Sequence, residues 1–287
     1  MFQLSVENEY NQRIYLSSMP EYTIVSIDGL SPMDASIYEM RNTGLDGSIF
    51  NSSAAEPRVI TMVVAINMPA EENRLNLYNY FKIKKKHRIF YSNGSRDVYI
   101  DGYLQSMPIG FFDEKQMATM VFRCPDPYFK EYAEIGLDVG NVISLFEFPF
   151  DIRKPIPFSE INIYGNKTIF NHGDVETGMI IRITGRDIHI ENPKIVNVST
   201  GEYIGIDGEI KKGEELVICT IDNHKYIKLI DGRYGSVTET NMMSYLMAGS
   251  SWIKIWPGEN VFHLLCDYDG SQFMNGSIVV NTLYEGV

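Results

Sequence analysis

The chain has 287 residues, 44% of them hydrophobic, and a formal net charge of −12. That length fits about two domains with a sizeable core, and no run of ~18 apolar residues is present to cross a membrane. The charge is uneven: 13 basic and 15 acidic residues give −2 for residues 1–130, whereas 12 basic and 22 acidic residues give −10 for residues 131–287. An acidic surface repels nucleic acid, so the second half is not expected to bind DNA or RNA specifically. The first residues lack the basic region and apolar core of a signal peptide, so we expect synthesis in the cytoplasm.

The first part of the chain predicts strands separated by an extended arm. Tyr22–Ile27 alternates between apolar and polar residues and predicts a strand. Ser31–Asn51 is poor in long apolar runs and carries Gly44, Asp46 and Gly47, which favours an extended arm or a long hairpin over a core element. Val59–Ile66 is apolar on both faces and predicts a central strand that is covered on both sides.

One helix is predicted after Pro69. The two glutamates that follow this proline suit a helix N-terminus, where carboxylates meet the positive end of the dipole. Leu75, Tyr78 and Phe81 follow with helical spacing, so the helix should cover one face of the sheet. The basic run Lys82–Arg88 suits the end of this helix, but clustered cations repel one another, which also favours an interface with an acidic neighbour.

A hairpin and a stiff exit follow the helix. Asn93-Gly94 stands between two alternating runs, and this dipeptide favours a hairpin because both residues tolerate positive φ. Gln116–Arg123 predicts a third strand. Pro125 and Pro127 cannot donate to a sheet ladder, so they end this strand and indicate a domain boundary near residue 130.

The second half, residues 131–287, predicts a linker and then a β-sandwich. The linker, which extends to about Ser159, contains Pro149, Pro155, Pro157 and the aromatic residues Phe146, Phe148 and Phe150. Short strands then recur about every 8–12 residues with turn residues between them, which is typical of a sandwich. The expected strands are Met179–Ile183, Ile188–Ile190, Ile195–Val198, Tyr203–Ile206, Leu216–Ile221, Trp252–Ile255, Val261–Leu265 and Ser277–Leu283.

Catalytic and metal-binding patterns are missing from the sequence. The five histidines are scattered, and the motifs of zinc proteases, P-loops, hydrolase elbows and dinucleotide-binding turns are absent. Cys124, Cys219 and Cys266 lie far apart, which favours buried free thiols over a disulfide or a zinc site. We therefore expect no catalytic residue, no cofactor, no metal ion and no enzymatic activity.

Two stretches leave alternatives open. The sequence from Asp267 to Ser271 has two carboxylates beside a glycine, as at the start of a calcium loop, but no closing acidic ligand follows, which favours an acidic turn. Trp252 and Trp256 are four residues apart on an expected strand and would share one face. The core of a sandwich is the favoured place for them, and stacking on a sugar ring is the alternative.

Several motifs together resemble a known family. NGSRDVYIDGY (Asn93–Tyr103), followed by a strand and CPDPYFK (Cys124–Lys130), is similar to the N-terminal domain of siphophage-type distal tail proteins. YTIVSIDGLSP (Tyr22–Pro32) and GLDGSIFNSS (Gly44–Ser53) resemble the same family, as does SSWIKIWPGEN (Ser250–Asn260) more weakly. The specificity comes from the number and order of these motifs, since each one alone specifies only turns and strands.

This resemblance implies a structural protein of a phage tail tip, located in the virion tail or in a phage tail-like particle. It implies a homo-oligomeric ring, six-fold in that family, formed by the N-terminal domains. The ring would join the tail-tube protein to the tail hub protein and can carry receptor-binding proteins. The expected fold is mainly β: a mixed-sheet or barrel-like domain with one helix over residues 1–130, then a galectin-like β-sandwich.

Two other classes of function stay open at this point. A carbohydrate-binding module that recognises the host cell wall is the alternative, because galectin-like sandwiches can bind sugars. A wall hydrolase is the third reading, and it requires two carboxylates ~5–10 Å apart across a cleft. For the oligomer and partner interface we expect two sets of residues: Asn42, Gly44, Asp46 and Gly47 in the arm, and Lys84, Lys85, Lys86 and Arg88 in the basic run.

Overall fold

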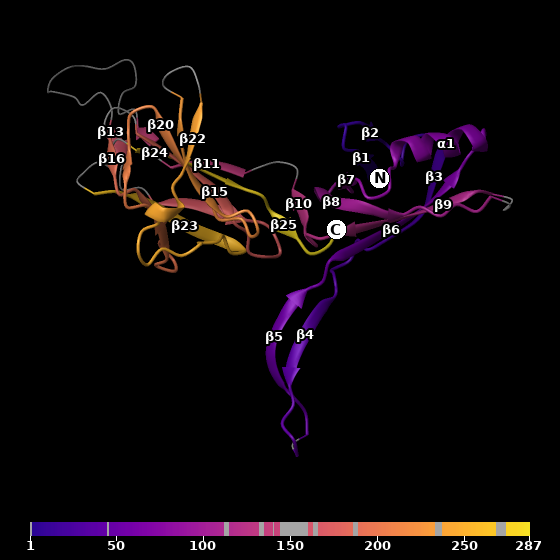
Figure 1. Ribbon diagram of the computed structural model, residues 1–287, viewed down its shortest axis with the longest axis horizontal. Coiled ribbons are helices and arrows are strands. Elements are labelled where there is room, and N and C mark those ends of the chain that lie inside the picture. Colours follow the sequence, from indigo (N-terminus) through magenta and orange to yellow (C-terminus); the bar gives the residue numbers. More distant parts are fainter. Residues whose placement is uncertain are drawn as a thin grey trace, which may run out of the picture. The chain divides into compact units, whose positions relative to one another are not determined.

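The computed structural model divides the chain into two compact units (Figure 1). Unit 1 consists of Met1–Tyr132 and Leu283–Val287, and unit 2 of Ala133–Thr282. The residues described are 2–44, 46–111, 115–131, 135–139, 141–143, 160–162, 166–185, 189–232, 237–267 and 274–287. No helix within these ranges is long and apolar enough to span a membrane.

A nine-stranded sheet is the framework of unit 1. Its strands are β1 (Gln3–Glu7), β2 (Arg13–Ile14), β3 (Tyr22–Asp28), β6 (Arg58–Ile66), β7 (Lys86–Ser92), β8 (Asp97–Ser106), β9 (Met117–Cys124), β10 (Phe129–Glu131) and β25 (Leu283–Tyr284). The main path runs β2-β1-β7-β8-β9-β6-β3, and β10 pairs with both β8 and β25.

The mainly β class is confirmed. The expected mixed, barrel-like sheet needs correction, because every described pairing in it is antiparallel and β2 and β3 stand at opposite ends of the path.

The predicted helix is α1 (Ala70–Tyr80), which packs near β6. Leu77 and, just after the helix, Phe81 are buried in the core of unit 1, whereas Leu75, which the sequence pattern placed in that core, is 48% exposed. The basic run does not end the helix as expected: it occupies the turn after α1 and then enters β7 at Lys86. Lys86, His87 and Arg88 pair with β8 in the sheet, which the helical pattern could not reveal.

The hairpin predicted at Asn93-Gly94 is present. Ser92 of β7 stands opposite Asp97 of β8, and Gly94 has a φ of 87°. The Asn93 side chain accepts hydrogen bonds from the backbone N–H groups of Ser95 and Arg96 at 3.0 and 2.9 Å. The turn is therefore held by its own asparagine, as its sequence indicates.

Two sheets form a sandwich in unit 2. The six-stranded sheet has the order β11 (Ile135–Val139), β24 (Met274–Val280), β15 (Met179–Gly185), β20 (Glu214–Cys219), β21 (Tyr226–Asp231) and β22 (Thr238–Asn241). The four-stranded sheet has the order β14 (Lys167–Asn171), β23 (Gly258–Leu265), β17 (Lys194–Asn197) and β18 (Tyr203–Gly205). One core joins them, with Ile181 and Ile218 from the first sheet and Ile195 and Phe262 from the second. Short elements complete the unit: β12 (Asn141–Ile143) with β13 (Glu160–Asn162), β16 (Ile190–Glu191) with β19 (Glu209–Ile210), and the 3-10 helix η1 (Met243–Tyr245).

Two details of the second half differ from expectation. The segment expected as a linker contains β11 and β12, while its prolines and phenylalanines between residues 144 and 159 lie outside the described residues. The strand expected at Trp252–Ile255 is reduced to a single bridge between Ile255 and Thr177.

Candidate assembly surface

The predicted arm is a long hairpin of unit 1. It is formed by β4 (Ala35–Met40) and β5 (Ile49–Ala55), which pair antiparallel with a bulge at Tyr38/Glu39. Figure 1 shows this hairpin projecting away from the nine-stranded sheet. Its residues are exposed along both strands, apart from the half-buried Ser36. In the described structure the hairpin therefore has solvent on both of its faces.

Both faces of the arm carry large apolar side chains. Residues that stand opposite one another in a ladder share a face, so Tyr38, Met40 and Ile49 lie on one face and Ile37 and Phe50 on the other. These five side chains are between 53% and 64% exposed. An exposed hairpin with apolar side chains on both faces favours pairing with another strand or burial against another surface.

The four arm residues expected at an interface lie at the far end of this hairpin, between Met40 and Ile49. Gly44 and Gly47 have φ angles of 90° and 87°, and a Cβ added to either would meet no atom within 4 Å. Asn42 precedes Gly44, Asp46 lies between the two glycines, and both are exposed. The glycines thus close the turn, while the apolar surface lies in the two strands that lead to it, which turn residues do not indicate.

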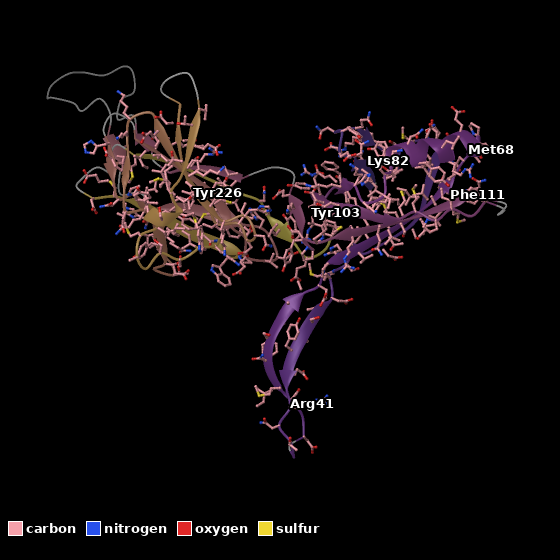
Figure 2. All side chains as sticks on the ribbon, in the orientation of Figure 1. Arg41, Met68, Lys82, Tyr103, Phe111 and Tyr226 are labelled. Atoms are coloured by element: carbon pink, nitrogen blue, oxygen red, sulfur yellow. The ribbon has the colours of Figure 1, made fainter. Side chains whose placement is uncertain are left out.

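The basic run is a second and separate surface, as the labels of Arg41 and Lys82 show in Figure 2. Lys85 Nζ lies 2.9 Å from Glu9 Oε2, and Lys86 Nζ lies 2.9 Å from Asp101 Oδ2. Arg88 Nε donates to Asp101 Oδ1 at 2.8 Å. Burial acts to raise the pKa of Asp101, but the hydrogen bonds from Arg88 and Lys86 outweigh it and lower that pKa.

These ion pairs reduce the repulsion among the cations of the basic run. Carboxylates of the same chain already face Lys85, Lys86 and Arg88. Lys84, which has a φ of 69°, is exposed and has no carboxylate partner among the described residues, and neither does Lys82. Within the described residues, Lys82 and Lys84 are therefore the lysines of the run whose charge is open to a carboxylate of another chain.

The other candidates raised by the sequence belong to neither of these two sets of residues. Cys124 and Cys219 are buried free thiols, and burial raises the pKa of Cys124 to about 12, while Cys266 is half-buried with a pKa raised to about 11. Asp267 accepts a hydrogen bond from Asn192 at 2.7 Å, and the rest of the suggested calcium loop lies outside the described residues. Within the described ranges, no three metal-binding side chains gather around one point.

The two tryptophans do not share one environment. Trp252 packs against the core of unit 2, as favoured, but Trp256 is 52% exposed. Asn260 holds the backbone at Trp256 by accepting from its N–H at 2.9 Å and donating to its carbonyl at 2.7 Å. Without a continuous strand here, the four-residue spacing does not place both rings on the same face.

Sequence reasoning missed the residue that organises the start of the arm, which we call the root (Gly29–Pro32). Arg58 is 3% exposed, and its guanidinium donates to the carbonyls of Gly29 at 2.6 Å and Ser31 at 2.5 Å. It also donates to Pro127 O at 2.7 Å and to Glu285 O. Burial lowers the pKa of Arg58. No sequence signal could identify this residue, because its partners are backbone carbonyls from three distant segments.

Most of unit 2 matches a known family model. Residues 172–273 match the model of the siphovirus-type tail component, C-terminal domain. The resemblance to siphophage-type distal tail proteins is thereby confirmed. No curated protein sequence matches the chain.

Particular solved structures share the fold over the whole chain. One is the SPP1 Dit (gp 19.1) protein, described as a paradigm of the hub adsorption apparatus in phages infecting Gram-positive bacteria; it has 15% identity and a TM-score of 0.66, and the match covers 99% of each chain. A second is a chain of the phage P2 baseplate in its activated conformation with calcium, with 10% identity, a TM-score of 0.53 and coverage of 100% of both chains. The same baseplate with strontium gives 10% identity, a TM-score of 0.52 and 98% coverage of each chain.

Proposed function

We propose that this chain is a structural protein of a phage tail tip or baseplate that assembles as a homo-oligomeric ring. The ring, of six copies as in the family it resembles, joins the tail-tube protein to the tail hub protein and can anchor receptor-binding proteins. It acts in the virion tail or a tail-like particle and has no enzymatic activity. The match to a tail-component family supports the class, and the similar SPP1 and P2 chains come from a hub adsorption apparatus and a baseplate.

The exposed arm is the observation that carries the ring proposal. Its two apolar faces belong to one hairpin that lacks Lys and Arg in both strands. A neighbouring copy that covers the hairpin would remove this apolar surface from water, at roughly 25 cal/mol per Å² buried. A closed ring lets every copy both give and receive such an arm.

The test is the mass of the purified protein and of arm variants. Wild type should form a ring by light scattering and negative-stain imaging, and Ile37→Thr with Phe50→Thr should reduce ring yield without lowering the melting temperature. Val198→Thr, an exposed apolar position in unit 2, is the matched control. A wild-type protein that is monomeric at high concentration and low salt contradicts the ring.

A carbohydrate-binding module is the second candidate, favoured by exposed aromatic rings in unit 2. Phe170 is 51% exposed, and its ring centroid lies 4.6 Å from that of His172. Aromatic rings of this kind can stack on sugars. Calorimetry with purified cell-wall glycan decides: binding that is lost in Phe170→Ala or Trp256→Ala supports this function, and absence of binding removes it.

A further inference from the structure

The segment Leu283–Val287 returns to unit 1 after the whole of unit 2. β25 pairs antiparallel with β10, with Phe129 opposite Tyr284. Tyr284 is buried in the core of unit 1, and the Arg96 guanidinium lies 4.2 Å from the centre of its ring. The Gly286 carbonyl accepts a hydrogen bond from Arg96. The segment is thus a fixed part of unit 1 and not a loose tail.

This segment also touches the root of the arm. Val287 N–H donates to Leu30 O at 3.1 Å, and Arg58 joins the carbonyl of Glu285 to those of Gly29 and Ser31. A Cβ at Gly286 would lie only 3.0 Å from Pro32 Cδ and 3.2 Å from Leu30 O. Backbone is therefore packed directly on backbone at the point where the hairpin leaves the sheet.

Arg58 makes these contacts depend on one another. A buried guanidinium has five N–H donors and a high desolvation cost, so each carbonyl that leaves exposes an unsatisfied charged donor. Arg58 also starts β6, directly after the second strand of the arm, and thus ties the outgoing stem of the hairpin to its incoming stem. Loss of Glu285 O would weaken the hold on both stems.

We infer that Leu283–Val287 acts as a clasp: with Arg58 it fixes the root of the β4–β5 hairpin, so that the arm is held in one direction for a second copy of this chain. The assembly part of this inference rests on the proposed ring, while the fixing of the root does not. Arg58 is a positioning residue in this scheme, since it binds no partner itself.

Two variants of the full chain test the clasp. Deletion of Glu285–Val287 removes the hydrogen bond to Leu30 and the carbonyls that accept from Arg58 and Arg96, and it retains Tyr284. Gly286→Ala is the milder change, because the new methyl pushes Pro32 and Leu30 by a few tenths of an ångström. Gly232→Ala is the matched control, since a Cβ there meets no atom within 4 Å.

Hydrogen exchange of the monomer is the first measurement, and ring yield is the second. We expect deuterium uptake at residues 29–34 to become at least several-fold faster in both variants, with ring yield lowered and Gly232→Ala unchanged. If the deletion does not fold, Gly286→Ala decides. Unchanged uptake in the folded variants overturns the clasp, and faster uptake with full ring yield overturns its role in assembly. A wild type that forms no ring refutes the proposed function, while the uptake still decides the clasp.

Discussion

Gly29 is the residue with the least freedom in the root. Its φ is +89°, and a Cβ on it would lie 2.1 Å from Val59 O. Gly29→Ala adds a steric clash with backbone to the strain of a left-handed conformation, and both reduce stability. We expect the free energy of unfolding of unit 1 to fall by about 2–4 kcal/mol, measured by urea denaturation.

Gly94→Ala is the control for this prediction. Gly94 has a similar φ of +87°, but a Cβ there would meet no atom within 4 Å. Strain alone should cost about 1 kcal/mol. If both variants lost the same free energy of unfolding, the clash with Val59 would not be the cause of the loss in Gly29→Ala.

His87 makes the stability of unit 1 depend on pH. Its ring is 1% exposed, stacks on Phe81 at 5.5 Å between centroids and meets the edge of Phe122 at 5.7 Å. Burial lowers the pKa of His87 below the ordinary value of 6.5. Because the unfolded chain then binds a proton that the folded chain excludes, this contribution to stability is complete above pH ~6.5 and is lost as pH falls below it.

His87→Phe should remove this dependence, because phenylalanine keeps the ring and cannot be protonated. Between pH 7.5 and pH 5 the melting temperature of wild type should fall further than that of His87→Phe. His189→Gln, an exposed position, serves as the control. Parallel curves for wild type and His87→Phe would contradict the assignment.

At the scale of elements, the basic run separates into lysines with and without carboxylate partners. Lys84 has no such partner in the described structure, whereas Lys86 is paired with Asp101. Lys84→Gln should lower ring yield with little change in melting temperature, because in the proposed ring a neighbour's carboxylate would attract this charge. Lys86→Gln should lower the free energy of unfolding by up to about 1 kcal/mol, as exposed ion pairs do.

A salt series checks the origin of the Lys84 effect. Screening acts over ~8 Å at physiological ionic strength, so the difference in ring yield between wild type and Lys84→Gln should shrink as salt rises. A ring yield that is the same for both proteins at every salt concentration would make the run an ordinary solvated surface.

The elements that the sequence predicted well are those with strong local signals. The turn at Asn93-Gly94, the strand before the prolines at Pro125 and Pro127, and the helix after Pro69 follow from nearby residues alone. The strand position of Lys86–Arg88 and the exposure of Leu75 depend on tertiary contacts, which the local spacing of residues does not reveal. The sequence indicated the arm as part of the candidate interface, but not its exposed apolar strands. It could not identify Arg58, because the partners of Arg58 are backbone carbonyls, which every residue has.

At the scale of the whole molecule, unit 2 is an insertion into unit 1. The chain leaves through β10 and returns through β25, and these two strands pair with each other. The sequence indicated a boundary between residues 1–130 and 131–287. We now predict that residues 133–282 fold alone, because their core includes only side chains of unit 2.

The same connection predicts the behaviour of unit 1 fragments. Residues 1–131 should melt at a lower temperature than the same residues joined through a short glycine-rich loop to residues 283–287. The loop can close β10 and β25 into a hairpin, since Lys130 stands opposite Leu283. Calorimetry of both fragments measures the difference, and identical melting would mean that β25 adds no stability.

The return of the chain to unit 1 also sets an order in time. Residues 283–287 leave the ribosome only after all of unit 2 has been made, so β25 cannot take its place beside β10 before then. Until that moment Arg58 lacks one of its carbonyl partners, although every other strand of unit 1 has long been available. Most of unit 1 is therefore made before unit 2 but is completed only after it, and until then the root of the arm lacks the contacts that Glu285 and Val287 supply.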